Sequence, residues 1–252
     1  MRLRSLTKHI NDQNWFAVAL DFLIVVVGVF VGLQVQQWAL ERQRQNSEGQ
    51  YLVRLHGEVE LLIESRAHYD VTRPRTSASL EAAVALLAGG SADDILTAAQ
   101  CSAIAASSHL TIPPADVPTI RELLSSAQLA QILSTNVREA ILIYTQHVAR
   151  ARDLITTLAK DAENLSRRYP SLIKVNYGPS PFASDGVWLN PVCDTLAMGK
   201  DDGFLNGLGN NAYLYNVYTN RAVLPVSRQL GILHKTLDQT LGITHTNEEA
   251  IP

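Results

Sequence analysis

The sequence has few of the residue patterns that catalysis or metal binding requires. It contains no HExxH, GxSxG, GxGxxG or P-loop motif. None of its seven histidines pairs with another and an acidic residue at a spacing typical of metal ligands. His234 and Asp238 lie four residues apart, which on a helix indicates a surface hydrogen-bonding pair. We therefore expect no enzyme activity, no cofactor and no metal site.

An excess of positive charge is also lacking. The chain has 21 Lys and Arg against 24 Asp and Glu, and its formal net charge is −3. Nucleic-acid binding normally needs a basic patch, so we expect no nucleic-acid partner. Aromatic residues make up only 6% of the chain, whereas alanine and leucine, which favour helices, are plentiful. This composition predicts an all-α fold.

One long hydrophobic run stands out. Between Phe16 and Val35, Asp21 is the only ionisable residue and Gln34 the only other polar one. About 20 residues of helix span roughly 30 Å, which matches the hydrocarbon layer of a bilayer. Trp15 and Trp38 bracket the run, as interfacial aromatics do. The sequence therefore predicts a transmembrane helix over 15–38. A cleaved signal peptide is disfavoured, because the run is too long and no small-residue cleavage site follows it.

The position of Asp21 inside this span needs a physical reason. Helical spacing places one stripe of residues on the same side of the helix: Asp21, Val25, Gly28, Gly32 and Gln36. The two glycines form a GxxxG pair, which lets another helix approach closely. A charged side chain at membrane depth costs about 2.5 to 3.5 kcal/mol on insertion scales and usually has a function. We expect this stripe to contact a membrane protein partner or a second copy of the chain. Two alternatives are a carboxylate at headgroup level and a proton carrier.

The stretch "NWFAVALDFLIVVVGVFVGLQVQQW" resembles the N-terminal span of a family of bacterial single-pass membrane proteins of unknown function. The matching positions are Asp21, Gly28, Gly32, Gln34 and Trp38. The resemblance covers little beyond the span, and it implies no activity. The architecture is also similar to that of proton-driven stator subunits, although no peptidoglycan-binding domain is recognisable.

The orientation of the span follows from basic residues and cysteines. Slightly more Lys and Arg precede the span than closely follow it, which favours a cytoplasmic segment 1–14. The chain has only two cysteines, Cys101 and Cys193, with no CxxC. We expect them to form a disulfide, which requires an oxidising compartment. Residues 39–252 are therefore predicted to be periplasmic, anchored in a bacterial inner membrane.

The exported part has helical periodicity. Residues 39–70 are predicted to be a stalk that becomes the first bundle helix and ends at Pro74. The bundle is expected to occupy 71–242, followed by a flexible tail at 243–252. Further helices are predicted at 79–88, 92–106 (with a cap at Ser91), 119–133 (with a capping box from Thr119 to Glu122), 137–165 and 208–241, the last interrupted by Pro225 and capped by Gly242.

A long loop interrupts this helical pattern. Residues 170–193 contain several prolines and glycines and no helical period. Short strands within the loop are an option that the sequence leaves open. A bond between Cys193 and Cys101 would fix the loop to the bundle. Trp188 is a candidate contact residue of this loop, with covering of the core as the alternative.

These observations leave three hypotheses about function. The first is a membrane-anchored structural or interaction subunit, an accessory component of a membrane complex whose exported bundle contacts a partner. The second is a ligand-sensing periplasmic bundle. The third is a stator-like component of a proton-driven machine, in which Asp21 carries the proton.

Overall fold

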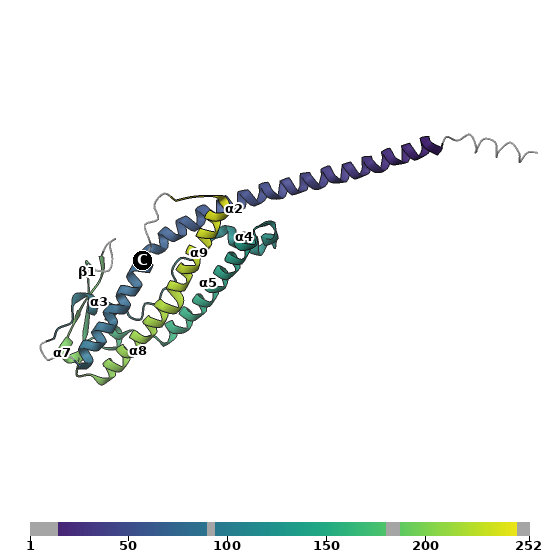
Figure 1. The fold of residues 1–252 in the computed structure, drawn as a ribbon. Coiled ribbons are helices and arrows are strands. Elements are labelled where there is room, and N and C mark those ends of the chain that lie inside the picture. Colours follow the sequence, from purple (N-terminus) through teal and green to yellow (C-terminus); the bar gives the residue numbers. More distant parts are fainter. Residues whose placement is uncertain (1–14, 90–93, 180–186, 246–252) are drawn as a thin grey trace, which may run out of the picture. The chain divides into compact units, whose positions relative to one another are not determined.

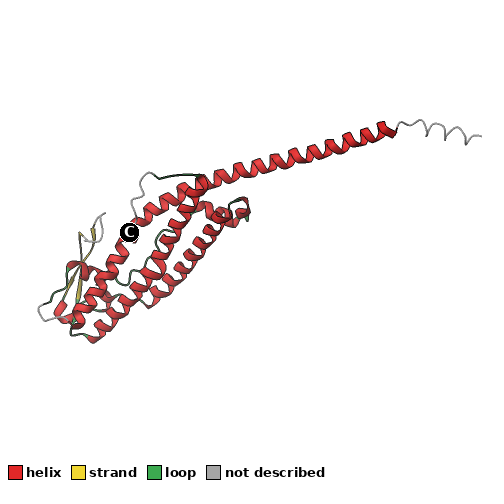
Figure 2. Cartoon of the chain, in the orientation of Figure 1, coloured by secondary structure: helices red, strands yellow, loops and turns green. Residues whose placement is uncertain are grey.

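The computed structural model describes residues 15–89, 94–179 and 187–245. The chain divides into two compact units, residues 1–50 and 51–252. One helix, α2 (Trp15–Gly89), begins in the first unit and ends in the second. Almost all other regular structure in the described residues is also helical (Figures 1 and 2). The all-α prediction is confirmed, with a single small two-stranded sheet added in the part that the structure describes.

The first unit contains the predicted membrane span. The part of α2 from Val18 onward contains an apolar stretch long enough to cross a membrane, and the protein buries none of this stretch. Large side chains such as Phe22 and Phe30 are exposed all around this part of the helix. The guanidinium of Arg42 lies 5.1 Å from the centre of the Trp38 ring. A helix with apolar side chains on every face is typical of a membrane span or of the core of a larger protein.

The second unit is a helical bundle. The C-terminal part of α2 packs with α5 (Thr135–Asp161), α8 (Asp202–Tyr218) and α9 (Leu224–Leu241). Figures 1 and 2 show α5 and α9 running side by side, and these two helices contact each other extensively. Apolar residues at three- and four-residue steps form one core, which includes Leu55, Val59, Ile141, Tyr144, Ile155, Leu230, Leu233 and Leu237. The apolar seam of α5, which includes Ile141, Tyr144 and Ile155, thus packs against a helix of the same chain.

The predicted break at Pro74 is wrong. Helix α2 continues through Pro74 to Gly89, so the separate helix expected at 79–88 is its last part. A proline inside a helix lacks a donor and clashes with the preceding turn, at a cost of about 3 kcal/mol. Buried side chains on both sides, among them Leu62 and Leu80, hold the two halves in the same core. Their packing offsets the cost of the proline.

The next two helices are shorter than predicted. Helix α3 (Ala98–Ala106) starts six residues later than expected, with a capping box formed by Thr97 and Gln100. The cap predicted at Ser91 lies outside the described residues. Helix α4 (Pro118–Ser125) is followed by a separate 3₁₀ turn, η1 (Gln128–Gln131), because Ala127 adopts a left-handed conformation with φ 55°. A single helix from 119 to 133 is therefore wrong.

The capping box predicted at the start of α4 does not form. Pro118 occupies the first turn, so the N-cap position falls on Val117 instead of Thr119. The backbone N–H and the hydroxyl of Thr119 each donate a hydrogen bond of 2.8 Å to the carboxylate of Glu58 on α2. An acidic side chain from another helix thus satisfies the donors at the start of α4.

The seam from Val137 to Leu165 is divided between two helices. Helix α5 ends at Asp161, where Ala162 is extended, and α6 (Leu165–Arg168) restarts with Asn164 as its N-cap. Glu163 N–H donates to the side-chain oxygen of buried Asn211 at 2.9 Å, and the Asn211 amide donates to the carbonyl of Glu163 at 2.7 Å. These bonds hold the chain between α5 and α6 in an extended conformation.

Two strands form where a long loop was expected. Strands β1 (Ile173–Pro179) and β2 (Val187–Cys193) pair antiparallel, with Ile173 opposite Cys193. Cys193 forms a disulfide with Cys101 on α3, at a Cα–Cα distance of 5.8 Å. The predicted disulfide is therefore present, and it fixes β2 to the bundle.

The last part of the bundle is interrupted near Pro225, as predicted. After the short helix α7 (Thr195–Met198), α8 runs to Tyr218, and a π-helical turn, η2 (Thr219–Val223), connects it to α9. Pro225 lies in the first turn of α9, where no backbone donor is needed. Gly242, with φ 69°, caps α9 as expected.

Candidate functional site

The packing face predicted on the apolar stretch of α2 is uncovered among the described residues. A Cβ atom added at Gly28 or Gly32 would meet nothing within 4 Å among the described residues. Asp21, Val25 and Gln36, on the same stripe, are exposed. The described residues therefore supply no cover for this face. The side chain of Trp15 lies outside the described residues, whereas that of Trp38 is exposed.

The candidate contact residue Trp188 lies on strand β2, opposite Gly178 in the register. Its side chain is outside the described residues. The hairpin places the backbone of Trp188 five residues before the disulfide at Cys193. Its role as a contact residue stays a prediction.

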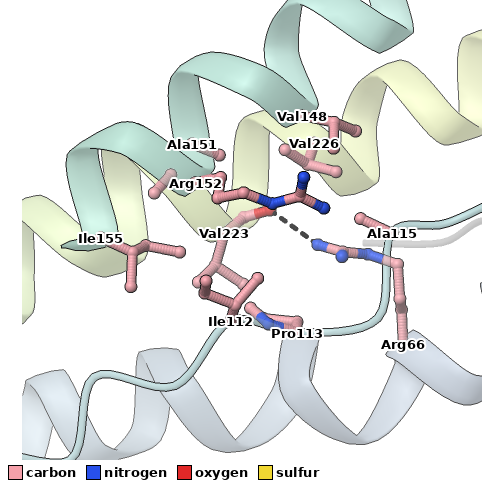
Figure 3. A pocket seen from close by; sticks show the side chains of 11 residues that line it. Arg66, Ile112, Pro113, Ala115, Val148, Ala151, Arg152, Ile155, Val223 and Val226 are labelled. Atoms are coloured by element: carbon pink, nitrogen blue, oxygen red, sulfur yellow. Dashed lines mark hydrogen bonds between the residues drawn. The ribbon is translucent and has the colours of Figure 1, made fainter.

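A pocket in the bundle is lined in part by Arg66 (Figure 3). Its volume is about 10 Å³, which is room for about one water molecule. Apolar residues of α5, α9 and the segment 112–115 line most of it. The pocket is therefore too small to receive a small organic ligand.

The guanidinium of Arg66 is used structurally. The residue is 1% exposed and donates hydrogen bonds to Ser227 Oγ, to the Pro114 carbonyl at 2.5 Å and to the Val223 carbonyl at 3.1 Å. Figure 3 shows the bond to Val223 as a dashed line. Burial lowers the pKa of Arg66, and the nearby carboxylate of Asp70 opposes this shift. The charge and the hydrogen-bond donors of Arg66 thus interact with groups of the bundle itself.

The most distinctive polar group in the bundle is a cluster that we call the histidine cluster: His56, Glu60, His234, Asp238 and His245. His56 and Glu60 lie one turn apart on α2, and His234 and Asp238 lie one turn apart on α9. His245 follows Gly242, the cap of α9. Three separate segments therefore converge here, and Figure 1 shows the C-terminal end of α9 beside α2.

Asp238 is the centre of the hydrogen bonds in this cluster. His56 Nε2 lies 2.7 Å and His245 Nε2 lies 3.1 Å from Asp238 Oδ1. His234 Nδ1 lies 3.5 Å from Asp238 Oδ2. Burial raises the pKa of Asp238, but the hydrogen bonds from His245 and His56 and the charge of His234 outweigh it, so the pKa lies below its ordinary value. The three neighbouring imidazoles thus favour the ionised form of the Asp238 carboxylate.

Glu60 faces the opposite nitrogens of two of these rings. Its Oε2 lies 3.6 Å from His56 Nδ1, and its Oε1 lies 3.7 Å from His234 Nε2. His56 and His234 are also stacked, with ring centres 5.0 Å apart. Each of these two imidazoles therefore spans the space between the carboxylates of Glu60 and Asp238. One ligand atom from each of His56, Glu60, His234 and His245 can be chosen so that all four lie within 4.8 Å of one another.

Only one pair of residues in this cluster, His234 and Asp238, is recognisable from the sequence. The pair His234 and Asp238 was expected, but as a surface pair, whereas the side chain of Asp238 is only 14% exposed. No spacing in the sequence groups the histidines with one another and an acidic residue, yet the folded chain brings His56, His234 and His245 close to Glu60. The sequence contains one further indication of the cluster, the four-residue spacing from His56 to Glu60. Nothing local links it to residues 234 to 245, because the contact forms only in the folded bundle.

Comparisons with protein-family models, with curated proteins and with solved structures found no match for this chain.

Proposed function

We propose that this protein is a membrane-anchored interaction subunit, an accessory component of a membrane complex. The carrying observation is the uncovered stripe of Asp21, Gly28 and Gly32 on an apolar helix that is long enough to cross a membrane. A GxxxG face allows close helix approach, and an acidic group at membrane depth needs a partner. The uncovered face thus matches what a second helix would fill.

The expected occupant of this face is a helix of a different membrane protein. In a symmetric pair of this chain, two Asp21 carboxylates would face each other and repel when ionised. A partner helix that presents a cation or a hydrogen-bond donor would avoid this repulsion. The bundle, residues 51–252, would then make its contacts on the other side of the membrane headgroups. The disulfide between Cys101 and Cys193 supports export into an oxidising compartment. A periplasmic domain anchored in a bacterial inner membrane is therefore part of the proposal.

The alternatives have less support. A ligand-sensing bundle needs a cavity, and the pocket at Arg66 has room for about one water molecule. A proton-carrying role for Asp21 shares the uncovered face but needs an activity that depends on the carboxyl group itself. An enzyme is not proposed, since the sequence carries no catalytic motif of the kinds sought.

The test is affinity purification of the intact chain from its native membrane in mild detergent, followed by mass spectrometry. Gly28→Leu should lose a defined membrane partner, because the leucine side chain prevents close approach. Val26→Leu is the matched control, since Val26 lies on the other side of the helix and its replacement should keep the partner. Asp21→Asn should weaken the complex.

Purification of the wild-type chain without any partner would overturn the proposal. If the partner still co-purifies with Gly28→Leu, the stripe that contains Gly28 is not the contact face. If Asp21→Asn kept the partner but abolished the activity of the complex, the proton-carrying hypothesis would replace the assembly role of Asp21.

A further inference from the structure

The histidine cluster has the composition of a metal centre, and two of the separations between its ligand atoms approach those of one. In a tetrahedral site with metal–nitrogen bonds of about 2.1 Å, neighbouring ligand atoms lie about 3.4 Å apart. The distances from Glu60 to His56 Nδ1 and to His234 Nε2 are 3.6 and 3.7 Å. These separations are within a few tenths of an ångström of a tetrahedral edge. They are too long for good hydrogen bonds, for which 2.7–3.2 Å is normal.

An unsatisfied nitrogen points to the missing ligand. His234 Nε2 is buried and has no hydrogen-bond partner. Glu60 Oε1 lies 3.7 Å from this nitrogen, beyond hydrogen-bond distance. A buried polar atom without a partner costs about 1 to 3 kcal/mol. A cation between His234, His56 and Glu60 would satisfy this nitrogen.

Asp238 is placed as an outer-shell carboxylate. Histidines that bind metals usually direct their other ring nitrogen to a carboxylate, which fixes the ring and raises its basicity. His56 faces Asp238 with Nε2 and Glu60 with Nδ1, and His234 faces Asp238 with Nδ1 and Glu60 with Nε2. Each ring thus has one nitrogen facing Asp238 and the other facing Glu60, where a cation would lie. The two carboxylates also balance the charge of a dication.

We propose that His56, Glu60, His234 and His245 bind one divalent transition-metal ion of the zinc class. Imidazole nitrogens with one carboxylate oxygen are the ligands that zinc, cobalt, nickel and copper accept, whereas calcium and magnesium require oxygen ligands. Four protein ligands fill a tetrahedral zinc site and leave no position for substrate, so the site is structural.

The ion would tie together three segments of the bundle. His56 and Glu60 come from α2, His234 from α9, and His245 from the residues that follow Gly242. Without a metal, His245 is connected to the cluster by one hydrogen bond of 3.1 Å to Asp238 and by ring contacts with His56 and His234. Metal binding therefore fixes the end of the bundle to α2, and its binding free energy adds to the stability of the folded unit.

The experiment uses the full-length chain, purified in detergent without a histidine tag and treated with a chelator. Calorimetric titration with Zn²⁺ measures stoichiometry and affinity, and Co²⁺ reports geometry through the intense visible absorption of its tetrahedral complexes. We expect one ion per chain in the wild type and tetrahedral Co²⁺ spectra. His68→Ala is the matched control, because His68 is exposed on α2 and outside the cluster.

Two variants make the assignment specific. His245→Ala removes a ligand that lies outside the helices, so the fold should be retained while the affinity for Zn²⁺ falls by at least about 100-fold. Asp238→Asn keeps all four ligands and should lower the affinity by about 10- to 100-fold, as loss of an outer-shell carboxylate does. Zn²⁺ should raise the melting temperature of the wild type and of His68→Ala, and the shift should shrink in both cluster variants.

The proposal is overturned if the wild type binds no Zn²⁺. It is equally overturned if the triple variant His56→Ala, His234→Ala, His245→Ala binds Zn²⁺ as tightly as the wild type, because the ion would then be held elsewhere. In either case the cluster is a hydrogen-bonded histidine–carboxylate network only. Neither outcome affects the proposed role of the membrane helix.

Discussion

Arg66 donates two hydrogen bonds to the same hydroxyl, that of Ser227, from Nε at 3.0 Å and from Nη2 at 2.8 Å. Ser227 in turn donates to Asp70 Oδ1 at 2.6 Å, so its oxygen uses both its accepting and its donating capacity. The chain from Arg66 through Ser227 to Asp70 connects α2 to α9 across the bundle core. A charge buried in this way is tolerable only because every partner is in place.

Replacement of Arg66 by methionine should destabilise the folded unit by about 3 kcal/mol or more. The substitution leaves the carbonyls of Pro114 and Val223 without their donor in a buried site. Urea unfolding of the full-length chain in detergent, followed by circular dichroism, measures this loss. Arg150→Met, at an exposed position of α5, should change the free energy of unfolding by less than about 0.5 kcal/mol. Equal stability of the two variants would contradict a structural role for Arg66.

Tyr144 should make stability depend on pH in the alkaline range. Its hydroxyl donates to the Ala115 carbonyl at 2.8 Å, and burial raises its pKa to about 12, although the nearby Arg66 lowers it. The folded state holds this proton more tightly than the unfolded state does. The resulting stability is fully present below about pH 10 and is lost as the pH rises through 12. A shift of about two units corresponds to roughly 2 to 3 kcal/mol.

The measurement is the free energy of unfolding of wild type and Tyr144→Phe between pH 8 and about 12. The variant should lose about 1 kcal/mol near neutral pH, where the hydrogen bond to Ala115 is missing. The difference between the two proteins should then shrink as the pH rises above about 10 and change sign before about pH 12, because the expected loss of the wild type exceeds about 1 kcal/mol and the variant has no proton to lose at this position. Tyr213→Phe is the control, because Tyr213 is exposed. A constant difference across the range would show that Tyr144 has an ordinary pKa.

Much of the architecture could be predicted from sequence patterns within single helices and their ends. The apolar run after Phe16, the seam at Ile141 and Ile155, and the cap at Gly242 are each set by residues close in sequence. Helical periodicity reports which face will be buried, whatever covers it. The disulfide could also be expected, because the chain has only two cysteines and one pairing.

The errors arose where distant residues override a local signal. Pro74 reads as a helix end, yet packing on both sides keeps α2 continuous. Thr119 reads as a cap, yet Glu58 on another helix takes its donors. His56 contacts Asp238 across 182 residues of chain, so no local spacing could reveal the histidine cluster. Side chains that join separate elements are visible only once the fold has brought the elements together.

The disulfide between Cys101 and Cys193 should contribute strongly to stability. It closes a loop with a sequence separation of 92, for which the loop-entropy model gives about 4 to 5 kcal/mol. The double variant Cys101→Ser, Cys193→Ser should lose stability of this order in urea unfolding. Wild type in reductant should approach the variant, and reductant should have no effect on the variant itself, because no cysteine remains. Equal stability of wild type and variant would show that the bundle needs no cross-link here.

The same two cysteines also test the proposed compartment. In an oxidising compartment both thiols stay bonded, so a thiol-alkylating reagent applied to freshly lysed, denatured membranes should not label the chain until a reductant is added. In a reducing cytosol they would be labelled at once, since the glutathione pool keeps such thiols reduced. A mass shift of two alkyl groups without reductant would therefore place the bundle on the cytosolic side. Because the helix contact at Asp21 and Gly28 needs no particular orientation, that result would reverse the proposed topology and leave the assembly face to be tested by itself.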